Sequence, residues 1–126
     1  MKFIPKLNTK TLGPYSPAVG VAGGSEILFL SGQIPLDGVT GTLNGDTIEE
    51  QTRQVFTNIR GLLADLNLDF SHIVKTTVFL KNMRDFASMN AVYTTFFPQD
   101  PPARTTVEVS ALPKEALIEI ECIVCR

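Results

Sequence analysis

Arg104 and Glu121 are the two residues whose types and positions best suit chemistry on a small molecule that carries a carboxylate. Arg104 follows Pro101-Pro102-Ala103 at the start of a predicted strand, where its planar guanidinium could hold a carboxylate through two parallel hydrogen bonds. Glu121 lies in the last predicted strand, and its carboxylate could activate water as a general base if desolvation brings its pKa toward neutrality. A surface arginine and a solvated acidic face are the alternatives.

Strand alternation decides which side chains can accompany these two residues. In residues 104–110 alternation places Arg104, Thr106 and Glu108 on one face of the strand. The other face carries Thr105, Val107 and Val109, and we expect this valine face to meet the core. In residues 116–125 it separates Glu119 and Glu121 from Ile118, Ile120, Cys122 and Val124. If the chain turns about Leu112-Pro113, Arg104 falls nearly opposite Glu121, although a slip of one residue would separate their faces.

Other residues could line a site near this pair. Tyr15 lies in a proline-rich segment, where it could wall a pocket or cover the core. Ser31 and Gly32 end a predicted strand, and the glycine would let backbone amides approach a ligand closely, although a plain turn is equally allowed. Asn90 lies inside a predicted helix, where asparagine is mildly unfavourable and needs an explanation.

Metal, redox and nucleophilic chemistry find little support. Cys122 and Cys125 are three apart in an alternating strand, so their side chains point to opposite faces. His72 is the only histidine, and we expect it to pack or cap rather than to catalyse. The soft ligands of one chain therefore cannot make a four-ligand zinc site, and no Ser-His-Asp or Cys-His arrangement can be argued. We expect no metal and no cofactor.

Length and charge narrow the function further. The chain has 126 residues and a net charge of -2, which fits one domain, residues 1–126, and predicts no nucleic-acid partner because no basic patch is visible. The longest apolar run, residues 27–30, is far shorter than the roughly 18 to 20 residues that span a bilayer, so no membrane association is expected. Residues 1–6 do not resemble a secretory signal, which makes the cytoplasm the expected location.

Hydrophobic periodicity predicts the elements that must position these residues. Residues 19–22 and 27–31 resemble a hairpin, residues 32–46 a loop, residues 73–80 a strand, and residues 104–110 and 116–125 the last two strands. A capping box at Thr47 predicts a helix ending near Asn67, and a second helix should begin at residues 82–85 and stop at Pro98. This order predicts an α+β fold, a mainly antiparallel or mixed sheet with two helices on one face. Its other face, left uncovered, suggests self-association.

At these residues the sequence resembles the RidA/YjgF family of reactive-intermediate deaminases, over nearly the whole chain. The resemblance is carried by residues 13–16, 31–35 and 73–80, by Asn90, by Pro102-Ala103-Arg104-Thr105, and by Leu112-Pro113 followed by residues 118–121. Membership implies a chorismate-mutase-like α+β sandwich assembled as a homotrimer, with sites in the clefts between subunits. The uncovered sheet face would then be trimer interior.

The resemblance also implies an activity and a set of site residues. The activity is hydrolysis of 2-imino acids, such as 2-iminobutanoate and 2-iminopropanoate, to 2-keto acids and ammonia. Arg104 corresponds to the arginine that binds the carboxylate and Glu121 to the glutamate that holds the water, and the remaining site positions correspond to Tyr15, Ser31, Gly32 and Asn90. Some members have a cysteine where this chain has Thr106, which leaves a hydroxyl as the available hydrogen-bonding group.

Three other functions share parts of this pattern. A non-catalytic trimer could use Arg104 to bind a small keto or amino acid for regulation. An RNA-directed activity is disfavoured by the acidic balance, and a chorismate mutase would rest on similarity of fold alone.

Overall fold

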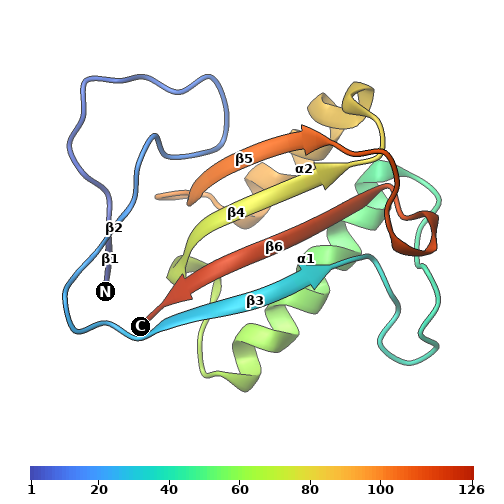
Figure 1. Cartoon of the computed structure of the whole chain (residues 1–126), viewed down its shortest axis with the longest axis horizontal. Coiled ribbons are helices and arrows are strands. Elements are labelled where there is room, and N and C mark those ends of the chain that lie inside the picture. Colours follow the sequence, from blue (N-terminus) through green and yellow to red (C-terminus); the bar gives the residue numbers. More distant parts are fainter.

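The computed structural model describes all 126 residues and shows a four-stranded mixed sheet with two helices on one face (Figure 1). In spatial order the strands are β3 (Ile27–Gln33), β6 (Ile118–Cys125), β4 (Ile73–Leu80) and β5 (Ala103–Glu108). β6 is antiparallel to β3 and β4, and β5 is parallel to β4. The helices are α1 (Ile48–Asp65) and α2 (Phe86–Phe96). The predicted α+β architecture is confirmed.

Short elements complete the chain. β1 (Lys2–Phe3) and β2 (Gly20–Val21) form a separate two-stranded ribbon, and single 3-10 turns cover Phe70–His72, Met83–Asp85 and Pro113–Glu115. Of the predicted helix start at residues 82–85, Asn82 therefore precedes a 3-10 turn and Met83–Asp85 form it, and α2 begins only after them. No helix combines the length and apolar character that crossing a membrane requires.

The predicted hairpin between residues 19–22 and 27–31 is wrong. β2 pairs with β1, in the register Lys2 to Val21, whereas β3 pairs with β6, in the register Leu28 to Val124. Leu28 and Leu30 of β3 pack against the hydrophobic core. A partner strand of two residues, such as β2, is too short to hold the seven residues of β3 in that position. β6 offers β3 both a backbone partner and a buried neighbour, so a pairing distant in sequence is favoured over the local one.

α1 begins and ends as its sequence predicts. The Thr47 hydroxyl accepts a hydrogen bond from the Glu50 backbone N–H at 3.2 Å, and the Glu50 carboxylate accepts one from the Asp46 N–H at 2.8 Å. The first bond satisfies a free amide of the first turn, and the second ties the residue before the N-cap to the helix. After α1, Asn67 adopts a φ of 60°, in the left-handed region that ends many helices.

Aromatic rings join the two helices to each other. Phe56 of α1 is fully buried, and its ring centroid lies between 4.5 and 5.9 Å from those of four other rings, Phe70, Tyr93, Phe96 and Phe97. Such pairs stabilise a core beyond the apolar area they bury. A hydrogen bond of 2.7 Å between the Tyr93 hydroxyl and the Thr76 hydroxyl joins α2 to β4, next to the strand that carries Arg104.

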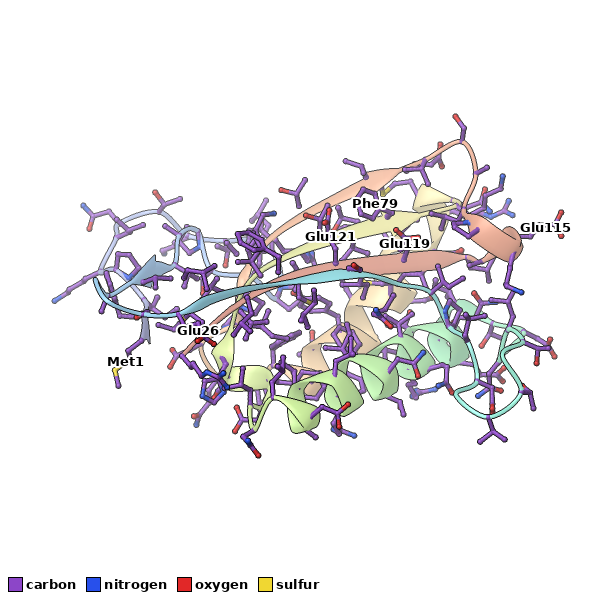
Figure 2. All side chains as sticks on the ribbon, turned by 60° about the horizontal axis from the view of Figure 1, so that its bottom comes forward. Met1, Glu26, Phe79, Glu115, Glu119 and Glu121 are labelled. Carbon is purple, nitrogen blue, oxygen red and sulfur yellow. The ribbon has the colours of Figure 1, made fainter.

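The sheet face away from the helices is open, and its composition follows from strand alternation. On β6, Ile118, Ile120, Cys122 and Val124 are buried beneath the helices, as predicted. Figure 2 shows Glu119, Glu121 and Phe79 on the opposite side of the sheet. We call this side the open face; by alternation and register it consists of Ile27, Phe29, Ser31, Glu119, Glu121, Ile123, Lys75, Thr77, Phe79, Ala103, Thr105 and Val107.

The prediction that the valine side of β5 faces the core is wrong. β5 pairs with β4 so that Arg104 lies beside Thr76 and Thr106 beside Val78, and both β4 residues are fully buried beneath the helices. Paired residues of neighbouring strands point to the same face of a sheet. Arg104 and Thr106 therefore face α2, while Val107 lies on the open face with 38% of its surface exposed.

Candidate functional site

Arg104 is held at the edge of the sheet by α2 and by three aromatic rings. Its Nη1 donates a hydrogen bond of 2.7 Å to Oδ1 of Asn90, in the middle of α2. Its Cζ lies 4.7 Å from the ring centroid of Tyr93, 5.3 Å from that of Tyr15 and 5.5 Å from that of Phe86. Cation-π contacts of this kind fix a guanidinium without neutralising it. The hydrogen bond to Arg104 therefore explains why an asparagine occupies this position inside a helix.

The charge of Arg104 has no acidic partner within the chain. The structure contains one ion pair, Arg126 with Glu26, and a His72–Asp69 contact that becomes an ion pair only when the imidazole is protonated; neither involves Arg104. Partial burial lowers the pKa of Arg104, and the nearby phenols of Tyr93 and Tyr15 act in the opposite direction and raise it. A guanidinium remains protonated at neutral pH even so. A half-buried cation with polar edges left over is suited to bind an anion.

A small pocket opens beside this guanidinium. Tyr15, Phe86, Arg104 and Thr106 line it, and its volume is about 190 Å³. The Thr106 hydroxyl is buried and has no hydrogen-bond partner. Leaving a buried hydroxyl unpaired costs roughly 1 to 3 kcal/mol, and a polar group of a bound ligand would remove that cost. The pocket is below the usual range of about 300 to 1,000 Å³ for drug-sized ligands, so it suits a small molecule.

The segment before β2 closes one side of the pocket. The Ser16 hydroxyl donates to the carbonyl of Pro101, and the Ser16 N–H donates to the carbonyl of Pro102 at 3.1 Å. These bonds attach Tyr15 to the entry of β5. At Gly13 an added Cβ would lie 3.1 Å from Cε1 of Tyr15 and 3.6 Å from Nη2 of Arg104, so the backbone approaches the site closely there.

A second group of predicted site residues lies on the open face. The β3 to β6 register shifts between Leu30 and Gln33, which places an irregularity at Ser31 and Gly32. Glu119 of β6 lies directly against Gly32, because an added Cβ at Gly32 would be 2.4 Å from Oε2 of Glu119. Glu121 follows two residues later on the same face (Figure 2).

Arg104 and Glu121 do not lie opposite each other in one chain, and that prediction is wrong. β4 separates their strands: Arg104 pairs with Thr76, and Glu121 pairs with Thr77. Thr76 and Thr77 are consecutive and point to opposite faces, so the guanidinium lies on the helix side and the carboxylate on the open face. The structure therefore unites Arg104, Tyr15, Asn90 and Thr106 but leaves Ser31, Gly32 and Glu121 in a separate group.

Comparisons with known proteins identify the relatives of this arrangement. Residues 6–126 match the model of a family described as Endoribonuclease L-PSP. The RutC family protein PH0854 of Pyrococcus horikoshii is 47% identical over 114 residues, covering 90% of this chain and 88% of that protein. The Reactive Intermediate Deaminase A of Arabidopsis thaliana, a chloroplastic protein, is 43% identical over 112 residues, covering 89% of this chain and 58% of that protein. The chain belongs to the RidA/YjgF family.

A solved RidA/YjgF structure agrees with the fold described above. The crystal structure of E. coli TdcF with bound serine superposes with a TM-score of 0.76 at 38% identity, covering 92% of this chain and 91% of that one. Serine, the molecule bound in that relative, is small and carries a carboxylate.

Sequence patterns missed three residues that contribute to the two groups in this RidA/YjgF chain. Phe86 and Tyr93 are not among the site residues that the sequence indicates, yet both contact the Arg104 guanidinium. Their positions, four before and three after Asn90, put them on the face of α2 that carries Asn90, and this spacing could have indicated their role. Glu119 was grouped with Glu121 by alternation, and no sequence signal indicates which of the two adjoins Gly32.

The two thiols are poorly placed for chemistry. Cys122 and Cys125 are free and buried, and burial raises the pKa of Cys122 to about 12. A thiol is a nucleophile and a metal ligand as its thiolate, so Cys122 is unreactive at neutral pH. His72 caps the 3-10 turn before β4, where its Nδ1 accepts from the Asp69 N–H at 3.1 Å.

Proposed function

We propose that this RidA/YjgF protein hydrolyses small 2-imino acids, such as 2-iminobutanoate and 2-iminopropanoate, to 2-keto acids and ammonia. The observation that carries the proposal is the unpaired Arg104 guanidinium in a small pocket walled by Tyr15 and Phe86. A carboxylate can bind the free edge of the guanidinium, and a short side chain can pack against the rings. The Arabidopsis relative named as a reactive-intermediate deaminase supports this choice of chemistry.

A complete site requires a second copy of the chain. The Arg104 group faces α2, whereas Ser31, Gly32, Glu119 and Glu121 belong to the open face or its rim. The open face also exposes apolar side chains, with Phe29 76% exposed and Ile27 41% exposed. Covering such a face stabilises an assembly in proportion to the apolar area buried. We therefore propose a homotrimer in which the open face of one copy completes the Arg104 pocket of another.

The proposed reaction needs orientation, an aimed water and proton transfer. A protonated imine is already electrophilic at carbon, so Arg104 has only to hold the carboxylate and a second group to deliver the water. The carboxylate base removes a proton as the water oxygen bonds to the imine carbon. The carboxylic acid so formed returns its proton to the nitrogen of the tetrahedral adduct. The regenerated carboxylate then takes the proton of the hydroxyl group as the C–N bond breaks, which forms the C=O bond of the keto acid and releases ammonia. No step of this route calls on a metal or a cofactor.

Two carboxylates are candidates for the base. Glu121 is the residue that sequence resemblance indicates. Glu119 is the residue that adjoins Gly32, where an irregular backbone could help to hold a water. We propose Glu119 as the base and keep Glu121 as the residue tested beside it. Glu119→Gln should preserve keto-acid binding and reduce kcat by about 100-fold or more, within the usual contribution of general base catalysis. Glu121→Gln should reduce it less, and the reverse order would return the role to Glu121.

The decisive experiment measures turnover of freshly generated imine. An amino acid oxidase supplies 2-iminopropanoate from alanine, and the loss of imine is followed with and without the protein. Arg104→Lys should raise KM strongly, because an ammonium cannot reproduce the bidentate contact. Arg60→Lys is the matched control, since Arg60 also lies over two rings, Phe70 and Phe96, but outside the pocket. Full activity of Arg104→Lys would refute the carboxylate clamp.

Two experiments distinguish the proposed deaminase from a binding protein and from a ribonuclease. A wild-type protein that binds 2-oxobutanoate but does not accelerate imine loss would be a binding or regulatory member of the family. RNA cleavage, which the description of the family model names, is tested by incubation with labelled RNA at low and high salt. We expect no cleavage, because a net charge of -2 gives little attraction for phosphates.

A further inference from the structure

Three charged residues lie on the open face, one positive and two negative. β4 contributes Lys75, and β6 contributes Glu119 and Glu121. β3 and β5 contribute apolar and hydroxyl side chains there: Ile27, Phe29, Ser31, Ala103, Thr105 and Val107. Lys75 is thus the one cation that the open face itself offers to its two carboxylates.

Lys75 is much nearer to Glu121 than to Glu119. Glu121 is opposite Thr77, two residues from Lys75, and Glu119 is opposite Phe79, four residues from Lys75. With a rise of about 3.3 Å per residue, the offset along the strand is roughly 6.6 Å to Glu121 and 13 Å to Glu119. Diagonal neighbours on one face are within reach of long side chains, so Lys75 can pair with Glu121 but not with Glu119.

The Lys75 ammonium retains one donor for such a pair. Its Nζ donates to Oγ1 of Thr105 and to the carbonyl of Thr76, each at 3.0 Å, and an ammonium has three donors. Partial burial lowers the pKa of Lys75, and the charge of Glu121 acts in the opposite direction. A second copy on the open face would remove water from Lys75, and a buried ammonium is costly without a counterion.

We propose that Lys75 is a positioning residue of the deamination site, which pairs with Glu121 in the assembled protein and leaves Glu119 as the carboxylate free to accept a proton. The inference rests on the proposed function and extends it to a residue outside the pocket. Two carboxylates with different environments can take different roles in one reaction. Here the difference is that Lys75, the cation of the same face, lies beside Glu121 and not beside Glu119, whereas Arg104 of the neighbouring copy binds the carboxylate of the substrate in this proposal.

The test is the pH dependence of kcat/KM for 2-iminopropanoate hydrolysis by the assembled protein. Lys75→Met leaves the Glu121 charge uncompensated two residues from Glu119, which should move the acid limb upward by about one pH unit. At pH values below that limb, kcat/KM of Lys75→Met should be about tenfold lower than that of the wild type. At pH values above it, the two proteins should reach the same plateau. Lys75→Arg keeps the charge and should keep the wild-type limb. Lys81→Met is the matched control, because Lys81 follows β4 and donates to the carbonyl of Ser110.

Variants of Glu121 test the same pair from the other side and do not depend on the folding of Lys75→Met. Glu121→Gln should move the acid limb downward, and Lys75→Met with Glu121→Gln should return it near the wild-type position. A uniform loss of activity in Lys75→Met, an unmoved limb in Glu121→Gln, or loss of turnover at every pH in Glu121→Gln would overturn the inference. An inactive wild-type protein would instead refute the proposed function itself, and the role of Lys75 with it.

Discussion

Asn90 provides a sharp test of the anion site, because two substitutions there should both weaken ligand binding, to different extents, and should differ in their effect on protein stability. The hydrogen bond from Arg104 Nη1 to Asn90 Oδ1 is 2.7 Å long and involves a charged donor. Bonds of this type contribute about 1.5 to 3 kcal/mol when buried. Since Arg104 is only half-buried, we expect Asn90→Ala to weaken binding by about 1 to 2 kcal/mol, or roughly 5- to 30-fold in Kd.

Asn90→Asp places a carboxylate on the guanidinium itself. It should compete with the carboxylate of the ligand and weaken binding by more than Asn90→Ala does, while the new, partly exposed ion pair adds up to about 1 kcal/mol of stability. Arg104 should hold the pKa of the introduced aspartate below its ordinary value. The added stability is then present at neutral pH and disappears as the pH falls through that lowered pKa, where ligand binding should recover.

The assay is calorimetric titration with 2-oxobutanoate, the product of the proposed reaction, together with thermal unfolding of each variant. Thr94→Ala is the control on the same helix, because its hydroxyl is exposed and donates only to the carbonyl of Asn90. If Asn90→Asp bound 2-oxobutanoate as tightly as the wild type at neutral pH, Arg104 would not be the group that meets the carboxylate.

Three further predictions concern the core, the open face and the thiols. Phe56→Ala should lower the free energy of unfolding in urea by about 3 to 5 kcal/mol, and a loss below about 1 kcal/mol would contradict the ring packing. Gly32→Ala should force the Glu119 carboxylate aside, since the new Cβ would lie 2.4 Å from Oε2. We expect kcat/KM to fall by about 100-fold with little change in Tm. Gly23→Ala is the control and should be neutral, because no atom lies within 4 Å of a Cβ added there. Cys122 should resist iodoacetamide at pH 8 until the protein unfolds, because its pKa is raised to about 12; rapid labelling of folded protein would refute its burial.

The sequence predicts the local elements well because their signals are local. The cap at Thr47 and the apolar stripe through Val55, Phe56 and Ile59 indicate α1, and the alternation of residues 73–80 matches β4 at both ends. Alternation also sorts β6 correctly into buried isoleucines and open glutamates. Each of these patterns reports which side of an element meets the core, and that preference is fixed by residues a few positions apart.

The pairing of strands is not local, and there the predictions fail. The neighbours of β3 and β5 depend on segments far along the chain, so alternation alone could not place Arg104 beneath α2 or reveal that β4 separates it from Glu121. The orientation of β5 was decided by its register with Thr76 and Val78. The site was consequently recognised as a set of residues, whereas its division between two faces of the sheet became visible only in three dimensions.

The central position of β6 has a consequence for how this chain reaches its native state. β6 is the last strand in chain order, yet it lies between β3 and β4 and pairs with both (Figure 1). During synthesis β3 and β4 therefore emerge with unpaired edges, and pairings between distant segments form slowly. Unpaired edges invite association with other chains. We expect the nascent protein to be most prone to aggregate in the interval before β6 leaves the ribosome, and to lose that tendency once the strand inserts.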